Sequence, residues 1–228
     1  MEDPIKTILL NTDTTCMLFD KLKQNGRFLF VSSSEIYEGC PNFPYKEDDI
    51  GRTNTNHFRS CYIESKRCGE AICNYYNKIG VYSKIARLSA VYGPGARADD
   101  SRVTSSFIRQ GIKNGRIELM DDGRATRTYC YVADTVEIMM NILANSNDCL
   151  YNVGGESRTT IANLAKLIGS VMNVPVIIPE VKKSLQGAPG DVMLDITKIK
   201  KEFNKSYFVS LEEGLLNAIS WHRKFYEY

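Results

Sequence analysis

Two short apolar segments, each following a segment of helical periodicity, constrain the fold of this chain more than any other feature. Apolar residues recur at helical spacing over residues 5–25, which predicts a helix, and residues 27–31 then have the pattern of a strand buried on both faces. A second predicted helix over residues 61–78 is followed by a predicted strand over 82–89. This alternation is typical of a doubly wound parallel sheet, so we predict an α/β fold.

The second half of the chain mixes shorter elements, without an internal repeat or a low-complexity segment. The pattern predicts helices over 102–113, 134–145, 160–172 and 210–226, and strands near 117–120, 128–131, 150–153 and 175–178. We therefore divide the chain into residues 1–95, which hold the doubly wound part, and residues 96–228, which form a smaller α/β lobe.

Composition and charge argue against several classes of function. The 228 residues include 29 basic and 27 acidic side chains, and the net charge of +2 gives no reason to expect nucleic acid or an anionic membrane as a partner. No apolar run approaches the roughly 20 residues that span a bilayer, and no signal peptide is visible. Seven scattered cysteines without a Cys-x-x-Cys pair favour reduced thiols, so we expect a cytoplasmic location. We expect His57 in a loop, His222 on the surface, and no metal site.

Tyr62 and Lys66 form the most informative local pattern. A spacing of four places both side chains on one face of the predicted helix. A neighbouring ammonium lowers the pKa of a tyrosine from its ordinary value of about 10, which suits a general base. The pattern alone also fits a solvated helix pair. Ser33 adds to it, because it follows a buried strand at the edge where open α/β sheets bind their ligands.

Five motifs in order resemble the extended short-chain dehydrogenase/reductase family, which contains the NAD-dependent epimerases and dehydratases. The subgroup most similar is the UDP-glucuronate decarboxylases. The motifs are Val31-Ser-Ser-Ser-Glu-Ile-Tyr37, Arg59-Ser-Cys-Tyr-Ile-Glu-Ser-Lys-Arg67, Arg87-Leu-Ser-Ala-Val-Tyr-Gly-Pro94, Asp100-Ser-Arg-Val103 and Asp122-Gly-Arg-Ala-Thr-Arg-Thr-Tyr-Cys-Tyr-Val-Ala-Asp134. The resemblance covers nearly the whole chain and implies a Rossmann-type sheet with a nucleotide-sugar-binding lobe over residues 96–228.

The resemblance also implies catalytic roles. Ser33 would polarise a sugar hydroxyl and Tyr62 would take its proton, while Lys66 would lower the tyrosine pKa and hold the nicotinamide ribose. Hydride would pass from sugar C4 to NAD, leaving a 4-keto intermediate. Ser34 and Glu35 match the positions that steer the second step. A Ser-Glu pair resembles the decarboxylases, and also occurs in GDP-mannose dehydratases.

Binding residues follow from the same resemblance. Ser32, with Tyr62 and Lys66, matches the positions that contact the cofactor NAD, and Arg59, Arg102 and Arg127 match those that contact the nucleotide sugar, most simply a UDP-sugar. The helices over 5–25 and 61–78 match those that pair in family homodimers, so we expect a homodimer. Epimerisation or 4,6-dehydration remains an alternative to decarboxylation.

The chain departs from the family at one important point. Family members begin with a Gly-x-x-Gly-x-x-Gly loop whose backbone N–H groups bind the cofactor pyrophosphate, and this sequence does not contain it. The resemblance implies about two further βαβ units upstream, without which the strand at 27–31, or its neighbour, has an unpaired edge. Three explanations stay open: a fragment, a natural split with a separate half, or a non-catalytic chain that binds a nucleotide sugar or a partner.

Overall fold

The computed structural model describes residues 3–179 and 191–226, which form two compact units. Unit 1 comprises Met1–Ser89, Val136–Gly154 and Met193–Ser206, and unit 2 comprises Ala90–Thr135, Gly155–Val192 and Tyr207–Tyr228. Each unit is therefore built from segments that are distant in sequence. The functional division at residue 95 stays a prediction.

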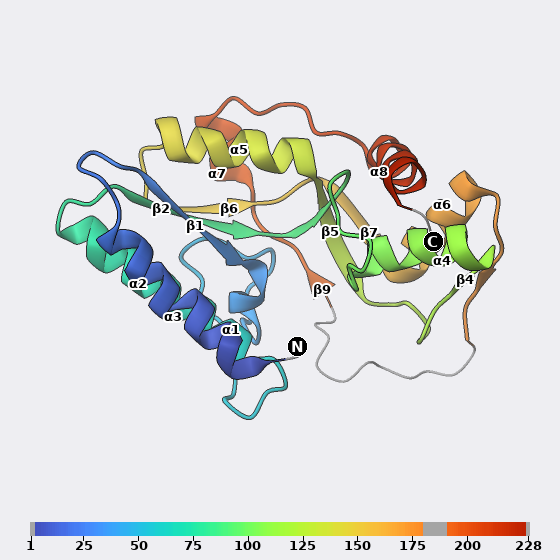
Figure 1. Cartoon of the computed structure of the whole chain (residues 1–228), viewed down its shortest axis with the longest axis horizontal. Helices are drawn as coiled ribbons and strands as arrows, with labels where there is room; N and C mark the ends of the chain where they lie inside the picture. Colours follow the sequence, from blue (N-terminus) through green and yellow to red (C-terminus); the bar gives the residue numbers. More distant parts are fainter. Residues whose placement is uncertain (1–2, 180–190, 227–228) are drawn as a thin grey trace. The chain divides into compact units, whose positions relative to one another are not determined.

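Unit 1 is organised around a parallel sheet. Its strands are β1 (Phe28–Ser33), β2 (Ser83–Leu88) and β6 (Leu150–Val153), in the order β1-β2-β6. Figure 1 shows α1, α2 and α3 along one side of this sheet, with α5 and α7 on the other. Helices on both faces are what the doubly wound pattern predicts, because a parallel sheet is buried on both sides.

The first predicted helix is two helices, so the expectation of one continuous helix over 5–25 is wrong. Helix α1 covers Pro4–Asn11 and α2 covers Asp13–Asp20, with Thr12 between them. The Thr12 hydroxyl donates to the Ile8 carbonyl at 2.9 Å, a bond from side chain to backbone that bends helices. Asn11 donates to Ser65 Oγ at 3.0 Å, which anchors this bend on α3.

Helix α3 (Ser60–Lys78) matches the predicted helix over 61–78 and packs on β1 and β2. Its Gly69 lies directly against the Phe30 ring, where a Cβ would come within 2.2 Å of Cζ. Phe30, Ile85 and Cys73 are buried together with Phe19 of α2. The absence of a side chain at residue 69 thus lets the helix approach the strand closely.

The remaining elements of unit 1 lie at strand ends and connections. A 3₁₀ helix, η1 (Ser34–Tyr37), follows β1 without a break. Helix α5 (Val132–Asn145) leads into β6, and the short helix α7 (Thr197–Glu202) contacts β6. The sequence did not predict η1 or α7, since four to six residues give too little periodicity.

Unit 2 is a mixed α/β unit. Strand β5 (Thr126–Tyr131) pairs in parallel with β3 (Ala90–Tyr92) and β9 (Asp191–Val192), and antiparallel with β7 (Ser157–Thr160). Strands β4 (Ile117–Glu118) and β8 (Val176–Ile177) form a separate parallel pair. Helices α4 (Val103–Asn114), α6 (Ile161–Met172) and α8 (Leu211–Phe225) share one apolar core with β5. Strands β7 and β9 were not predicted.

Strand β1 is one of the two strands at which the sequence predicted an unpaired edge. Within the described residues it pairs with β2 and with no second strand. Val31 on this strand is 39% exposed, although its neighbour Phe30 is buried.

Across residues 3–179 and 191–226, every helix is too short or too polar to span a membrane.

Candidate functional site

Ser33, Ser34 and Glu35 lie where β1 ends and η1 begins. The Ser33 hydroxyl accepts a hydrogen bond from the Glu35 backbone N–H at 3.2 Å, so Ser33 caps the 3₁₀ helix. Ser33 is 9% exposed, whereas Ser34 and Glu35 are half-buried. Ser33 is the last residue of the strand, two residues beyond the predicted strand end. The strand end therefore presents the three residues in one tight turn.

Tyr62 and Lys66 lie one turn apart in the first half of α3, and Lys66 contacts β1. Lys66 Nζ donates to the Val31 carbonyl at 2.8 Å, and it lies 5.9 Å from the centre of the Tyr62 ring. Burial lowers the pKa of the Lys66 ammonium, and the Glu70 carboxylate one turn further along opposes this shift. The helix thus brings its lysine into contact with the strand that carries Ser33 and to 5.9 Å from the centre of the tyrosine ring.

Arg59 joins Glu35 to the same group. It caps the start of α3 and pairs with the Glu35 carboxylate through Nε and through Nη2, the latter at 2.7 Å from Oε1. The same guanidinium lies 5.0 Å from the centre of the Tyr62 ring. An unbroken series of contacts therefore connects Ser33, Glu35, Arg59, Tyr62 and Lys66. These side chains, predicted from separate motifs, lie together in unit 1.

Ser32 is held inside the unit rather than at its surface. Its hydroxyl donates to Glu70 Oε1 at 2.5 Å, and the same carboxylate accepts two hydrogen bonds from Arg87, at 3.0 and 2.7 Å. Both members of this ion pair have less than a tenth of their side chain exposed. Sequence reasoning did not single out Glu70. Two signals in the sequence could have identified it. Glu70 lies four residues after Lys66, and Arg87 in a buried strand requires a counter-charge.

Arg102 and Arg127, two of the three predicted contacts to the nucleotide sugar, lie in unit 2, whereas the third, Arg59, lies in unit 1. Arg102 precedes α4 and forms an ion pair with Asp100 at 2.8 Å, with 68% of its side chain exposed. Arg127 lies on β5, and its Nη1 donates to the Thr126 carbonyl at 2.7 Å. Both guanidinium groups are thus held on the unit that we interpret as the sugar-binding lobe.

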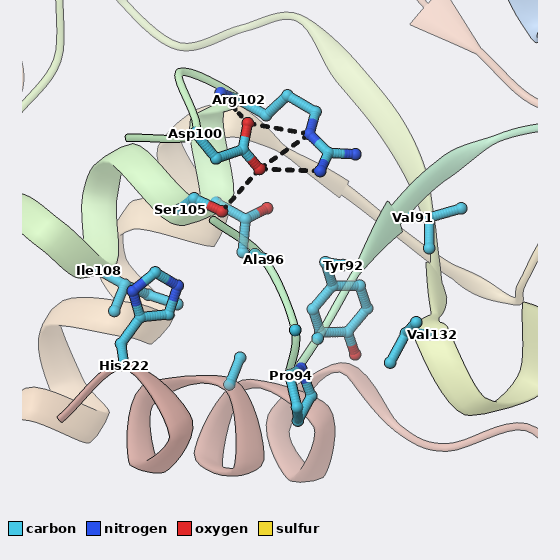
Figure 2. A pocket seen from close by; sticks show the side chains of 14 residues that line it. Val91, Tyr92, Pro94, Ala96, Asp100, Arg102, Ser105, Ile108, Val132 and His222 are labelled. Carbon is cyan, nitrogen blue, oxygen red and sulfur yellow. Dashed lines mark hydrogen bonds and ion pairs between the residues drawn. The ribbon is translucent and has the colours of Figure 1, made fainter. Parts of the chain in front are cut away.

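Unit 2 also contains a pocket of about 150 Å³ that the sequence did not reveal (Figure 2). Asp100, Arg102 and Ser105 line one side of it, and His222 lines another. The expectation that His222 lies on the surface is wrong, since it is 1% exposed. It falls at helical spacing from Leu215 and Ala218 on the buried face of α8, and this spacing decides its position.

A family model decides the classification of the chain. The model described as the NAD dependent epimerase/dehydratase family matches residues 1–154. The chain belongs to this family. Its Rossmann-type α/β fold is the one predicted from the sequence.

Two of the relatives that the chain resembles are UDP-glucuronic acid decarboxylases. UDP-glucuronic acid decarboxylase 1 of Arabidopsis thaliana is 34% identical over 220 residues, which cover 96% of this chain and 50% of the relative. The enzyme of the same name from Xenopus tropicalis is 32% identical over 226 residues, covering 98% and 53%. The chain thus spans about half the length of these relatives.

Solved structures agree on the fold of this epimerase/dehydratase chain. UDP-glucose 4-epimerase from Thermotoga maritima, solved with UDP-glucose, superposes with a TM-score of 0.85 at 25% identity, covering 99% of this chain and 73% of the other. UDP-glucuronic acid 4-epimerase from Bacillus cereus, solved with UDP-glucuronic acid and NAD, gives 0.83 at 23% identity, covering 96% and 69%.

The residues present fit the nicotinamide end of NAD, the cofactor named in the description of the family. Lys66 binds the Val31 carbonyl near the carboxyl end of β1, where such sheets bind nucleotides, and its Nζ lies 5.9 Å from the centre of the Tyr62 ring. The glycine loop for the pyrophosphate does not occur in the sequence. For metals, the described residues contain no group of three or more His, Cys, Asp or Glu side chains that could hold an ion.

Proposed function

We propose that this chain carries the catalytic residues of an NAD-dependent enzyme that decarboxylates UDP-glucuronate through a 4-keto intermediate. One observation carries the proposal: Ser33, Glu35, Arg59, Tyr62 and Lys66 are connected by contacts at the end of β1. The similarity to UDP-glucuronic acid decarboxylases over 96% of the chain supports the choice of substrate.

The residues divide the first step between them. NAD, when bound, supplies the acceptor for the hydride that leaves sugar C4. Tyr62 takes the proton of the 4-hydroxyl group, and the Lys66 ammonium stabilises the phenolate form that can do so. Ser33, at the strand end, donates a hydrogen bond to the same sugar oxygen. The product of this step is a ketone at C4.

The second step follows from the position of the ketone. In a sugar with a carboxylate on C5, a ketone at C4 accepts the electron pair that is released when CO₂ leaves. We assign Glu35 and Ser34, both in η1, to this step. A proton from the solvent then takes the place of the lost carboxylate at C5, which converts the enolate to a 4-ketopentose. Return of the hydride to C4 and of a proton to its oxygen gives a UDP-pentose. Arg59, which is already paired with Glu35, can orient the sugar carboxylate.

Calorimetric titration of the purified chain with NAD, UDP and UDP-glucuronate tests the proposal. We expect binding of the nucleotide sugar, and weaker NAD binding in Lys66→Met than in wild type. Lys78→Met is the matched control, because Lys78 is exposed at the end of the same helix. Failure of all three ligands to bind would refute the proposal. Where turnover occurs, release of CO₂ with a UDP-pentose supports decarboxylation, and UDP-galacturonate indicates a 4-epimerase.

A second candidate function is binding of a nucleotide sugar without turnover. The predicted sugar-nucleotide contacts Arg102 and Arg127 support it, because guanidinium groups bind phosphate whether or not turnover follows. This function predicts that UDP-glucuronate binds while NAD does not. Reduction of NAD by this chain in the presence of UDP-glucuronate would exclude it.

We also propose a homodimer that forms through α1, α2 and α3. Large apolar side chains on the first two helices are about half exposed or more, which supports an interface there: Ile5, Leu9, Leu10, Met17 and Leu18. Sedimentation equilibrium of wild type and of Leu10→Glu/Met17→Glu tests it. We expect a dimer that the double variant converts to monomer, and a monomeric wild type would contradict the proposal.

A further inference from the structure

Glu70 is a buried residue of α3 that contacts β1 next to Ser33. It is 6% exposed, on the same helix as Tyr62 and Lys66 and at spacings of eight and four residues from them. These spacings place the three side chains along one face of α3. Sequence motifs assign chemistry to the tyrosine and the lysine, and leave the carboxylate without a role.

The partners of Glu70 come from two neighbouring strands. Ser32 of β1 and Arg87 of β2 are directly paired in the parallel register, so their side chains leave the sheet on the same face. The Glu70 carboxylate binds both, receiving the Ser32 hydroxyl at 2.5 Å and the Arg87 guanidinium at 3.0 and 2.7 Å. One side chain therefore ties the helix to two strands at once.

The contact between Glu70 and Ser32 lies beside the contact between Lys66 and Val31. Lys66 binds the carbonyl of Val31, Glu70 binds the side chain of Ser32, and the next residue is Ser33. Two helix-to-strand contacts, one helical turn apart, thus act on consecutive strand residues. Together they set the position of the strand end relative to the helix, and hence that of Ser33 relative to Tyr62.

Arg87 extends the connection to η1. Its Nη1 donates to the Tyr37 hydroxyl at 2.6 Å and to the Glu47 carbonyl at 2.7 Å. Tyr37 is the last residue of the 3₁₀ helix that begins with Ser34. The ion pair between Glu70 and Arg87 therefore touches both ends of the segment that carries the predicted catalytic serines and Glu35.

A buried ion pair needs a reason beyond stability, because replacing one with apolar side chains is often neutral or stabilising. We propose that Glu70 is a positioning residue, which holds the helix of Tyr62 and Lys66 against the strand of Ser33 and keeps a negative charge one turn from the Lys66 ammonium. The proposal deepens the proposed function and rests on it.

The pH profile of Lys66 acylation, resolved peptide by peptide with mass spectrometry, tests this role without any nucleotide. The Lys66 ammonium faces the Phe30 ring at 5.1 Å and the Val31 carbonyl from β1, and the Tyr62 ring and Glu70 from its own helix. We expect Glu70→Gln to move the midpoint of the Lys66 profile to lower pH, because it removes the charge that opposes the effect of burial.

Three further variants make the test decisive. Glu70→Asp keeps the charge and should restore much of the wild-type midpoint. Glu64→Gln is the matched control, since Glu64 lies on the same helix, is 42% exposed and pairs with Arg67, and it should leave the midpoint unchanged. The double variant Glu70→Met/Arg87→Met removes both charges of the pair and leaves neither one buried without a partner. We expect it to fold even if Glu70→Gln does not.

A folded variant without the Glu70 carboxylate that keeps the wild-type Lys66 midpoint would overturn the proposal. That result would leave the proposed function intact, because ligand binding is measured separately. Conversely, a chain that binds neither NAD nor a nucleotide sugar would refute the proposed function without changing the Lys66 profile.

Discussion

Arg59 holds the Glu35 carboxylate with two nitrogens, although the two residues are 24 positions apart and belong to different elements. The pair connects the start of α3 to η1, and its members are 29% and 23% exposed in their side chains. It makes Glu35 part of a fixed structure, in contrast to the solvated loop carboxylate that the sequence alone would allow.

A double-mutant cycle with Glu35→Gln and Arg59→Gln measures the interaction free energy of this pair. We expect a coupling free energy of about 1 kcal/mol in the stability towards urea, because the contact is bidentate and less than a third of each side chain is exposed. Arg97 and Asp99 give the control cycle, since their side chains are 83% and 71% exposed and their coupling should be close to zero. Equal coupling in both cycles would contradict the interpretation.

Tyr37→Phe should destabilise the protein by about 1–3 kcal/mol, because it leaves buried partners unsatisfied. The Tyr37 hydroxyl donates to Asn152 Oδ1 at 2.8 Å and accepts from Arg87, and burial raises its pKa to about 12, so it stays a phenol. Urea unfolding followed by far-UV circular dichroism measures the loss.

Tyr129→Phe is the matched control for this substitution. Tyr129 is 2% exposed, and its hydroxyl has no hydrogen-bond partner among the described residues. Removing that hydroxyl should therefore be neutral or slightly stabilising. The single tryptophan, Trp221, lies in the same unit and reports its unfolding by fluorescence. A large loss of stability in Tyr129→Phe would show that the hydroxyl has a partner after all.

Gly69→Ala should cost about 1–3 kcal/mol, because the new methyl group would overlap the Phe30 ring. The neighbouring Cys68 is exposed, so Cys68→Ala should change the free energy of unfolding by less than about 0.5 kcal/mol. Phe30→Leu combined with Gly69→Ala should recover part of the loss. Strictly additive effects of the two substitutions, measured by urea unfolding, would argue against the contact.

The free energy of unfolding should decrease from pH 7 to pH 5.5, in part because His222 is protonated more readily in the unfolded chain than in the folded one. Burial lowers the pKa of His222 from its ordinary 6.5, Arg109 lowers it further, and Asp100 opposes both. As the pH falls through about 6.5 the unfolded chain takes up a proton that the folded chain does not, so the stability present above this pH is lost below it. His222→Gln should reduce this loss in urea titrations at the two pH values. His57→Gln removes the other histidine and separates the two contributions.

Much of the fold follows from local sequence patterns. The predicted strand over 150–153 matches β6, and the predicted helix over 61–78 matches α3 to within one residue. Each pattern is set by residues within one or two turns of each other, which is the range over which periodicity is defined. The break at Thr12 escaped prediction because threonine fits the helical spacing while its hydroxyl competes for the backbone.

The sequence alone indicated most of the longer helices and strands in their order, and it placed Ser33 at a strand end and Tyr62 with Lys66 on one helix face. Tertiary structure decided which charges are buried together. Glu70 meets Ser32 and Arg87, 38 and 17 residues away, through the register of β1 with β2 and the packing of α3 on both. Such a contact depends on three elements at once, and no local pattern contains that information.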